Sequence, residues 1–177
     1  MASGGLVYRI PGASWTLDLP AEVLAAVQAH AQKRWWSKEA VGQLFTSDPR
    51  QSSVRVDAVT RLTPKSASRT GLRLDIPAVD KERKLMFDQG LHCLGFWHTH
   101  PEATPSPSPD DIELAAEHAR AGKSSFAGLV FVIMGTSPLP EGLGVWVHDG
   151  TILWRALLEA DSSPAVAKKR CYPESHA

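Results

Sequence analysis

The sequence has little cysteine and no long apolar run. Cys93 and Cys171 are the only cysteines among 177 residues. Two cysteines do not make the disulfide framework of a small secreted protein, and this favours a reducing compartment. The longest nearly apolar stretch, residues 126–134, is too short to span a bilayer, and the first residues lack the features of a signal peptide. We therefore expect a cytoplasmic protein with no membrane partner.

The sequence also has no excess of charge of either sign. Lysine and arginine total 19, aspartate and glutamate total 19, and only Lys168, Lys169 and Arg170 form a basic cluster. Proteins that bind nucleic acid usually have a basic excess or a basic stripe, so we expect no nucleic-acid partner. There is no glycine-rich phosphate loop and no internal repeat, which argues against a nucleotide-binding loop and a repeat architecture.

What the sequence does contain is a mixed order of helix and strand patterns. Helical spacing of apolar residues covers residues 20–36, 77–92 and 110–121. Strand patterns cover residues 6–10, 15–19, 40–46, 53–62 (with a break near Ala58), 72–76, 91–97, 126–135, 143–148 and 151–157, and residues 63–70 are predicted to form a loop. This order predicts an α/β (α+β) fold, with helices packed on the faces of a mixed β-sheet. We expect one domain over residues 1–160 and a disordered tail over residues 161–177.

The tryptophans are divided between the predicted core and the surface. Trp97, Trp146 and Trp154 fall in predicted strands, and we expect them to pack in the core. Trp35 and Trp36 are adjacent, so they should point to different faces of the first helix, with one of them exposed. Core packing is favoured over use at an interface.

Two histidines follow each other at the end of a predicted strand. His98 and His100 are two residues apart, so their side chains project from the same face and both imidazoles can reach one ion. Asp111 is the natural third ligand after a return loop. Two imidazoles and one carboxylate would leave the fourth position of a zinc ion for water, which is the pattern of a catalytic site.

Each of these pieces also has a simpler explanation. A single His-x-His is common in proteins that bind no metal. Ser108 is a good N-cap residue, Pro109 suits the first helical position, and Asp111 favours the helix dipole without any metal. Asp110 is the competing ligand, and its simpler role is that of a solvated acid in the first helical turn.

The whole pattern is more specific than its parts. His98-Thr99-His100-Pro101 is followed by six residues and then by Ser108-Pro109-Asp110-Asp111. This pattern resembles the signature of the JAMM (MPN+) metallopeptidase family, and the resemblance covers roughly residues 20–157. The family has a glutamate upstream on the strand after the first helix, and Glu39, 59 residues before His98, is similar to it.

The resemblance implies the fold and the roles of these residues. The fold would be the MPN/JAB-like (cytidine-deaminase-like) mixed sheet. His98, His100 and Asp111 would hold Zn²⁺, and the family spacing favours Asp111 over Asp110. Glu39 would take a proton from the attacking water and deliver it to the leaving amine. Ser108 would donate a hydrogen bond to the oxyanion of the tetrahedral intermediate.

The resemblance also implies a class of substrate. The compact sequence looks like the small prokaryotic JAB proteins encoded beside E1-like and E2-like enzymes in bacterial antiviral operons. Such a protein would cleave after the C-terminal glycine of a ubiquitin-like protein, either from its conjugates or from its precursor. The extended tail of that protein would add at a sheet edge near the cleft, beside the strand predicted over residues 72–76 or the loop before it.

Three other functions remain open at this point. A JAMM-like enzyme could instead trim a sulfur-carrier protein to expose its Gly-Gly end. An MPN domain could be a non-catalytic scaffold, although this chain keeps every ligand type. A DNA-repair module is suggested only by analogy of fold, and the zero net charge argues against it.

Overall fold

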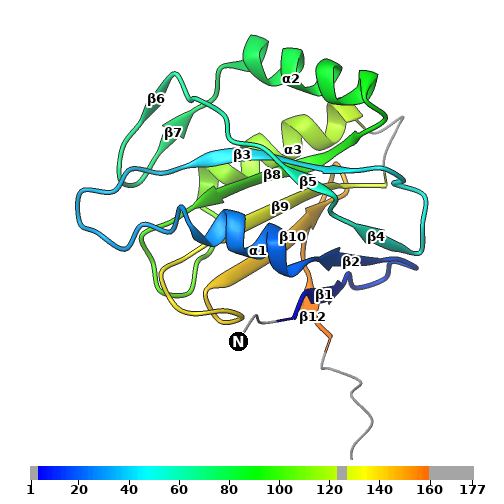
Figure 1. Ribbon diagram of the computed structural model, residues 1–177, viewed down its shortest axis with the longest axis horizontal. Helices are drawn as coiled ribbons and strands as arrows, with labels where there is room; N and C mark the ends of the chain where they lie inside the picture. The colour runs from blue at the N-terminus through cyan, green and yellow to red at the C-terminus, as the bar shows by residue number, and fades with distance from the viewer. Residues whose placement is uncertain (1–3, 123–126, 160–177) are drawn as a thin grey trace, which may run out of the picture.

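The computed structural model describes residues 4–122 and 127–159 and is built around a six-stranded sheet (Figure 1). Its strands are β3 (Val41–Thr46), β5 (Ala58–Val59), β8 (His92–Thr99), β9 (Leu129–Met134), β10 (Leu143–His148) and β11 (Leu153–Arg155). They are arranged in the order β11-β10-β9-β8-β3-β5. β8 and β9 are parallel and the other neighbours are antiparallel. The predicted mixed sheet is therefore confirmed.

Two helices cover one face of this sheet, α2 (Ile76–Asp88) and α3 (Pro109–Gly122) (Figure 1). Phe96, Phe131 and Ile133 of the sheet share a core with Val79 of α2 and Ala115 of α3. α3 buries only alanines, and their small side chains let the helix backbone lie close to the strands. This short separation matters because α3 begins beside the candidate site.

The other face is covered by α1 (Ala21–Gln28) and a second sheet. That sheet contains β1 (Leu6–Arg9), β2 (Thr16–Leu19), β4 (Ser53–Arg55) and β12 (Leu157–Leu158), in the order β12-β1-β2-β4. Leu17, Val23 and Val54 pack with Leu44 and Trp97 of the central sheet in the larger core. Residues of β8 alternate between these two cores, so the strand that carries the histidines is buried on both faces.

A small hairpin stands beside the central sheet and corrects two predictions. Its strands are β6 (Ser66–Ala67) and β7 (Leu72–Arg73), which pair with each other. The loop predicted over residues 63–70 therefore contains a strand, and the strand predicted over residues 72–76 ends at Arg73. The chain turns into α2 at Asp75, since Pro77 in the first turn has a backbone angle that suits a helix start.

The first helix is shorter than the predicted 20–36. The helix α1 ends in hydrogen bonds that span three residues instead of four, from the amides of His30 and Ala31 to the carbonyls of Val27 and Gln28. The chain then continues without regular structure to β3. Buried Gln32 holds this segment by side-chain bonds to the carbonyls of Ser37 and Arg69, which replace the helical bonds. The second helix likewise ends at Asp88 instead of 92, where Gly90 takes a positive φ of 79°.

The tryptophan predictions are partly wrong. Trp97 and Trp146 are buried as expected, but Trp154 is partly exposed and donates a hydrogen bond to the Asp149 carboxylate. Trp35 and Trp36 are both exposed, because they lie in the segment after α1 and not on a helix with one buried face.

Two predictions concern the ends of the chain and the membrane. The tail predicted over residues 161–177, and with it the domain boundary at 160, lies outside the described residues and stays a prediction. Within residues 4–122 and 127–159, no helix combines the length and the apolar character that crossing a bilayer requires.

Candidate metal centre

The two histidine side chains meet at the end of β8. His98 Nε2 lies 2.9 Å from His100 Nε2, and both residues are buried. The ring of His98 faces Phe131 on the side of the sheet that α2 and α3 cover. Trp97 and Thr99 point to the other side, where Trp97 stacks on His30 and Thr99 bonds to Gln32. The alternation expected of a strand therefore brings the two imidazoles together, as predicted.

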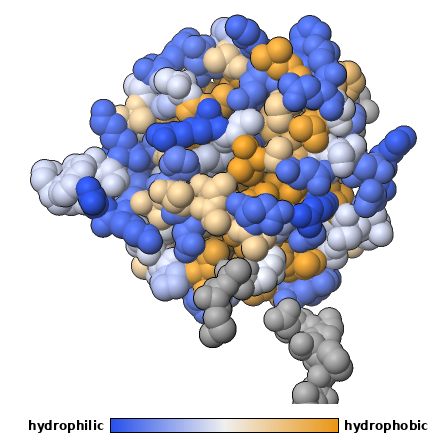
Figure 2. Space-filling model, in the orientation of Figure 1, coloured by the Kyte–Doolittle hydropathy of each residue, from blue (hydrophilic) through white to orange (hydrophobic). Residues whose placement is uncertain are grey.

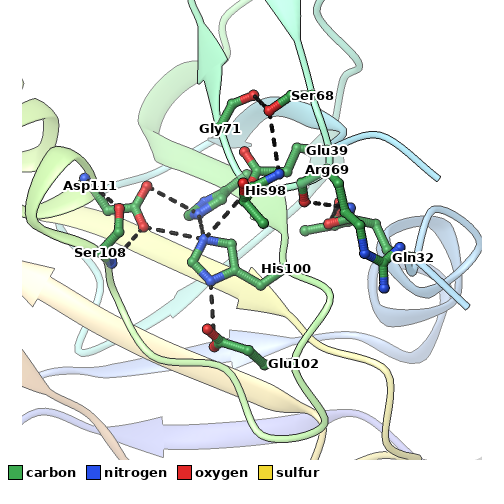
Figure 3. A network of polar contacts seen from close by, with 12 residues as sticks. Gln32, Glu39, Ser68, Arg69, Gly71, His98, His100, Glu102, Ser108 and Asp111 are labelled. Carbon is green, nitrogen blue, oxygen red and sulfur yellow. Dashed lines mark hydrogen bonds and ion pairs between the residues drawn. The ribbon is translucent and has the colours of Figure 1, made fainter. Parts of the chain in front are cut away.

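Asp111 enters the same space from the first turn of α3 (Figure 3). Its Oδ1 lies 3.2 Å from His98 Nε2 and its Oδ2 lies 3.2 Å from His100 Nε2. The Ser108 amide donates to Asp111 Oδ2 at 2.8 Å, and the Asp111 amide donates to Ser108 Oγ at 3.2 Å. This reciprocal pair is a capping arrangement. The capping and the ligand interpretations of Asp111 are therefore compatible, because the carboxylate that accepts the Ser108 amide also faces both histidines.

The three donor groups fit a single small cation. His98, His100 and Asp111 offer ligand atoms that all lie within 4.8 Å of one another. Ligands at about 2.0–2.1 Å from a tetrahedral zinc ion are separated by about 3.3 Å. The observed separations of 2.9 and 3.2 Å are close to that value. Asp110 is exposed and does not belong to this group, so the geometry separates it from Asp111.

The charges around the donors also suit a cation. Burial lowers the pKa of His98 and so favours the neutral imidazole that binds metals. Burial acts in the same direction on His100, but the carboxylates of Asp111, Glu39 and Glu102 together raise its pKa. Burial tends to raise the pKa of Asp111, but bonds from the two histidines hold it well below its usual range. Asp111 is therefore favoured as a charged carboxylate, the form that could serve as a ligand to a cation.

Glu39 lies two residues before β3 at the rim of this group. Its amide donates to the Ser68 carbonyl at 2.8 Å, and its Oε1 is 3.9 Å from His100 Nε2. The residue is only 7% exposed, and its pKa is raised to about 7. Burial is the main cause of this raised pKa. The charge of His100 lowers the pKa, whereas the carboxylates of Asp111 and Glu102 raise it. A carboxyl group with a pKa near neutrality can both accept and release a proton at physiological pH.

Glu102 supports the site and was missed from the sequence. Its Oε2 lies 3.6 Å from His100 Nδ1, on the side of the ring opposite to the candidate ligand atom (Figure 3). Carboxylates in this position orient metal-binding histidines and set their tautomer. The available signal was a glutamate two residues after His100.

A second missed residue is Gln32, which is 1% exposed. Its Nε2 donates to the carbonyls of Ser37 and Arg69 at 3.1 and 2.9 Å, and its Oε1 accepts from the Thr99 hydroxyl at 3.2 Å. The Thr99 hydroxyl in turn accepts the amide of Ala40 at 3.0 Å. Gln32 therefore joins the strand of the histidines to the segment that carries Glu39.

These side chains open on a cleft beside the hairpin. Glu39, His98, Ser108 and Asp111 line one part of it, and residues 70–74, which include β7, line another. An extended peptide in this cleft would lie against β7, as predicted for the substrate tail.

Comparison with known proteins agrees with this geometry. Residues 20–149 match the family described as prokaryotic homologs of the JAB domain. The chain belongs to this prokaryotic JAB family. The matched residues include all five residues predicted to act in the site.

Individual relatives of this JAB protein are distant. A curated protein of Enterobacter hormaechei subsp. hoffmannii (strain UCI 50), named CD-NTase/cGAS isopeptidase, is 25% identical over 140 residues, 78% of this chain and 77% of that protein. The solution structure of protein DSY2949 from Desulfitobacterium hafniense has a TM-score of 0.55 at 22% identity, over 75% of this chain and 84% of that one. A protein from Salinibacter ruber has a TM-score of 0.48 at 23% identity, over 76% and 84% of the two chains.

The predicted family and the predicted mixed α/β fold are thus confirmed. The predicted isopeptidase class agrees with the family and with the name of the Enterobacter relative. The separate roles of Glu39, His98, His100, Ser108 and Asp111 stay predictions.

Proposed function

We propose that this JAB protein is a zinc-dependent isopeptidase that cleaves after the C-terminal glycine of a ubiquitin-like protein. The observation that carries the proposal is the convergence of His98, His100 and Asp111 beside buried Glu39, at the rim of a cleft. The family match and the name of the Enterobacter relative support the same reaction class.

His98, His100 and Asp111 would hold the metal through two imidazole nitrogens and one carboxylate oxygen. A bound zinc ion would supply an activated water at neutral pH and would polarise the scissile carbonyl. Other divalent ions accept the same donors, so the identity of the metal as zinc is itself proposed.

Glu39 would move the proton in this reaction. Its carboxylate takes a proton from the attacking water, and its pKa of about 7 lets it give that proton to the leaving amine. The amine is a lysine ε-amine in an isopeptide bond, or an α-amine in a linear fusion. The contact with His100 and the burial of Glu39 support this role, because they keep the carboxylate beside the group that would bind the metal.

Ser108 would stabilise the oxyanion. Its Oγ accepts the Asp111 amide through a lone pair, which leaves the hydroxyl hydrogen free to donate. One hydroxyl can therefore cap α3 and donate to the developing negative charge. A glycine at the cleaved position would let the substrate backbone approach closely, because it has no Cβ.

The test is cleavage of reporter fusions by the full chain, with and without a zinc chelator. The panel contains ubiquitin, ubiquitin-like proteins encoded beside E1-like and E2-like enzymes, a conjugate of a CD-NTase, and a sulfur-carrier protein, each joined at its C-terminal glycine. Chelator-sensitive cleavage after the glycine is the expected result, and the member cleaved fastest names the substrate. Cleavage of the sulfur carrier alone would change the substrate to that class.

Metal analysis of the same preparation completes the test. Protein that carries no metal and cleaves nothing would overturn the proposal in favour of a scaffold. We further propose that the protein acts in the cytoplasm, together with E1-like and E2-like enzymes and without nucleic acid or membrane.

A further inference from the structure

Two separate segments of the chain are basic and contain no acid. Residues 29–38 contain Lys33, Arg34 and Lys38, and residues 58–74 contain Arg61, Lys65, Arg69 and Arg73. Neither segment contains aspartate or glutamate, although the chain as a whole has a net charge of 0. Apart from the adjacent Lys33 and Arg34, successive basic residues within each segment are four residues apart.

The fold brings these two segments together. Arg69 Nη1 donates to the carbonyls of Arg34 and Trp35 at 2.8 and 2.9 Å. Gln32 donates to the Arg69 carbonyl, and the Glu39 amide donates to the Ser68 carbonyl. The loop after α1 therefore lies against the β6–β7 hairpin, at one end of the central sheet (Figure 1). Basic residues from both segments are therefore gathered in this region.

Two exposed indoles stand in the middle of this basic region. Trp35 is 78% and Trp36 is 58% exposed, their rings meet edge to face at 5.5 Å, and the Arg34 guanidinium lies 5.4 Å from the Trp36 ring. Contiguous exposed apolar side chains mark interaction sites, and tryptophan and arginine are enriched among the residues that contribute most to protein binding. In Figure 2 the end of the molecule that carries this loop and the hairpin is mostly blue to nearly white, so the side chains there are mainly hydrophilic.

The charges in this region have no acidic counterpart in the structure. Among residues 4–122 and 127–159, none of Lys33, Arg34, Lys38 and Arg69 forms an ion pair with an acid. We call these four residues, with Trp35 and Trp36, the basic–aromatic surface. An acidic partner would satisfy its charge and cover its indoles at the same time.

The surface is also joined to the catalytic residues. Trp36 is three residues from Glu39, and Ser37 and Arg69 are bonded to the same buried Gln32 that holds Thr99 between the histidines. A molecule bound at this surface would therefore lie beside the cleft.

We propose that the basic–aromatic surface binds an acidic face of the folded part of the ubiquitin-like protein whose C-terminal tail enters the cleft. This inference rests on the proposed function. The ubiquitin-like part is common to all conjugates, whereas the target protein changes, so a surface built on a fixed backbone suits the common part. Nucleic acid is also negatively charged and could pair with this surface. The proposed peptide-cleaving site, whose Glu39 is three residues from Trp36, favours a protein as the partner.

The test separates docking from chemistry by using two substrates of different size. The first is the reporter fusion that the wild-type protein cleaves fastest in the panel above. The second is a coumarin amide of the last six residues of the same ubiquitin-like protein, which can fill the cleft but cannot reach the surface. We expect Trp36→Ala and Trp35→Ala each to raise KM for the fusion at least about tenfold. Their kcat/KM for the coumarin amide should stay within about twofold of wild type.

Charge is tested by a second variant and by salt. The double variant Lys33→Glu/Arg34→Glu should raise KM for the fusion further. Salt between 50 and 500 mM should raise KM for the fusion with the wild-type protein, but not for the coumarin amide. Phe87→Ala is the matched control, since Phe87 is an exposed aromatic residue on α2 outside the surface, and it should change neither substrate.

The outcomes distinguish this inference from the proposed function. A wild-type protein that cleaves the fusion, with Trp variants that keep the wild-type KM, would overturn the inference alone. A wild-type protein that cleaves neither substrate would overturn both. A third outcome would assign the surface to nucleic acid instead. In that case a 30-nucleotide single-stranded DNA binds the wild-type protein, the Trp variants lose this binding, and their KM for the fusion does not change.

Discussion

The hydroxyl of Thr99 and the side-chain oxygen of Gln32 are joined by a buried hydrogen bond of 3.2 Å. Thr99 lies between the two histidines on β8, and its hydroxyl also accepts the amide of Ala40, the residue after Glu39. The candidate base and the candidate metal ligands thus share one hydroxyl group as a common support. This relationship makes Thr99 a positioning residue whose side chain never needs to touch the substrate.

Thr99→Val should lower kcat roughly tenfold, whereas Thr99→Ser should keep most of the activity. Valine has nearly the same shape as threonine but removes the bonds that Thr99 makes to Gln32 Oε1 and to the Ala40 amide, at a cost of about 1–3 kcal/mol in stability. Steady-state kinetics, thermal melting and zinc content check this together. Equal kcat in the two variants, with zinc bound in both, would remove the positioning role.

Glu39→Gln should reduce turnover at least about 10²-fold while the metal stays bound. The amide has the size of the carboxylate but cannot take a proton from water, and general-base catalysis contributes about 10²–10⁴ in rate. Zinc content and kcat measured on one preparation give both readouts. Activity near that of the wild type would exclude Glu39 as the base.

Asp111→Asn should lose the metal, and Asp110→Asn should keep it. Asparagine can still accept the Ser108 amide and cap α3, so the helix should remain folded while the charged ligand is lost. The neighbouring Asp110 is the matched control, because the same change is made one residue away on an exposed side chain. Chelator treatment should abolish wild-type activity, and added zinc should restore it. Zinc bound equally to both variants would contradict the ligand assignment.

Ser108→Ala should lower kcat about 10²–10³-fold and the free energy of unfolding by about 1 kcal/mol. The two effects separate the roles of the hydroxyl, since a lost helix cap alone lowers stability and leaves the chemistry intact. Ser108→Thr keeps both an acceptor and a donor and is the control. A kcat that stays near wild type in Ser108→Ala, despite the loss of stability, would leave only the capping role.

Part of the loss of stability in acid should come from His118. This side chain on α3 packs against Phe96 with ring centroids 4.9 Å apart, and burial lowers its pKa below 6.5. Arg83 lowers it further, while Asp80 and Glu117 oppose the shift. At low pH the unfolded chain therefore binds a proton at His118 more readily than the folded chain does. The contribution of His118 to the free energy of unfolding is complete above the ordinary histidine pKa and is lost as the pH falls below about 6.5.

His118→Gln should therefore lose less stability than wild type between pH 7.5 and 5.5. Chemical denaturation of the zinc-loaded proteins at the two pH values measures the difference. An equal loss in variant and wild type would show that His118 titrates alike in the folded and unfolded states.

Much of the candidate centre could be predicted because it depends on local geometry. The two-residue spacing of His98 and His100 on a strand sets both imidazoles on one face, whatever surrounds the strand. The bonds between Ser108 and Asp111 belong to one helix start and need no distant residue. The main strands of the central sheet likewise follow from their own apolar patterns, whereas β6 of the separate hairpin has no such pattern.

Other features of the site could not be read from local patterns. Glu39 reaches the histidines only because β3 pairs with β8, with Val41 opposite His98, and this register joins residues far apart in the chain. Gln32 was predicted on a helix, since nothing near it in sequence indicates that its amide bonds to Ser37 and Arg69.

The sequence by itself determined the family, the mixed fold and the candidate donor set of His98, His100 and Asp111, because each follows from patterns within short stretches of the chain. The tertiary structure alone decided the position of Glu39, the support by Gln32 and Thr99, and the basic–aromatic surface. These depend on contacts between segments tens of residues apart, whose free energy is set by packing and by the burial of polar groups. Charges that are scattered along the chain become one surface only when the loop after α1 meets the β6–β7 hairpin.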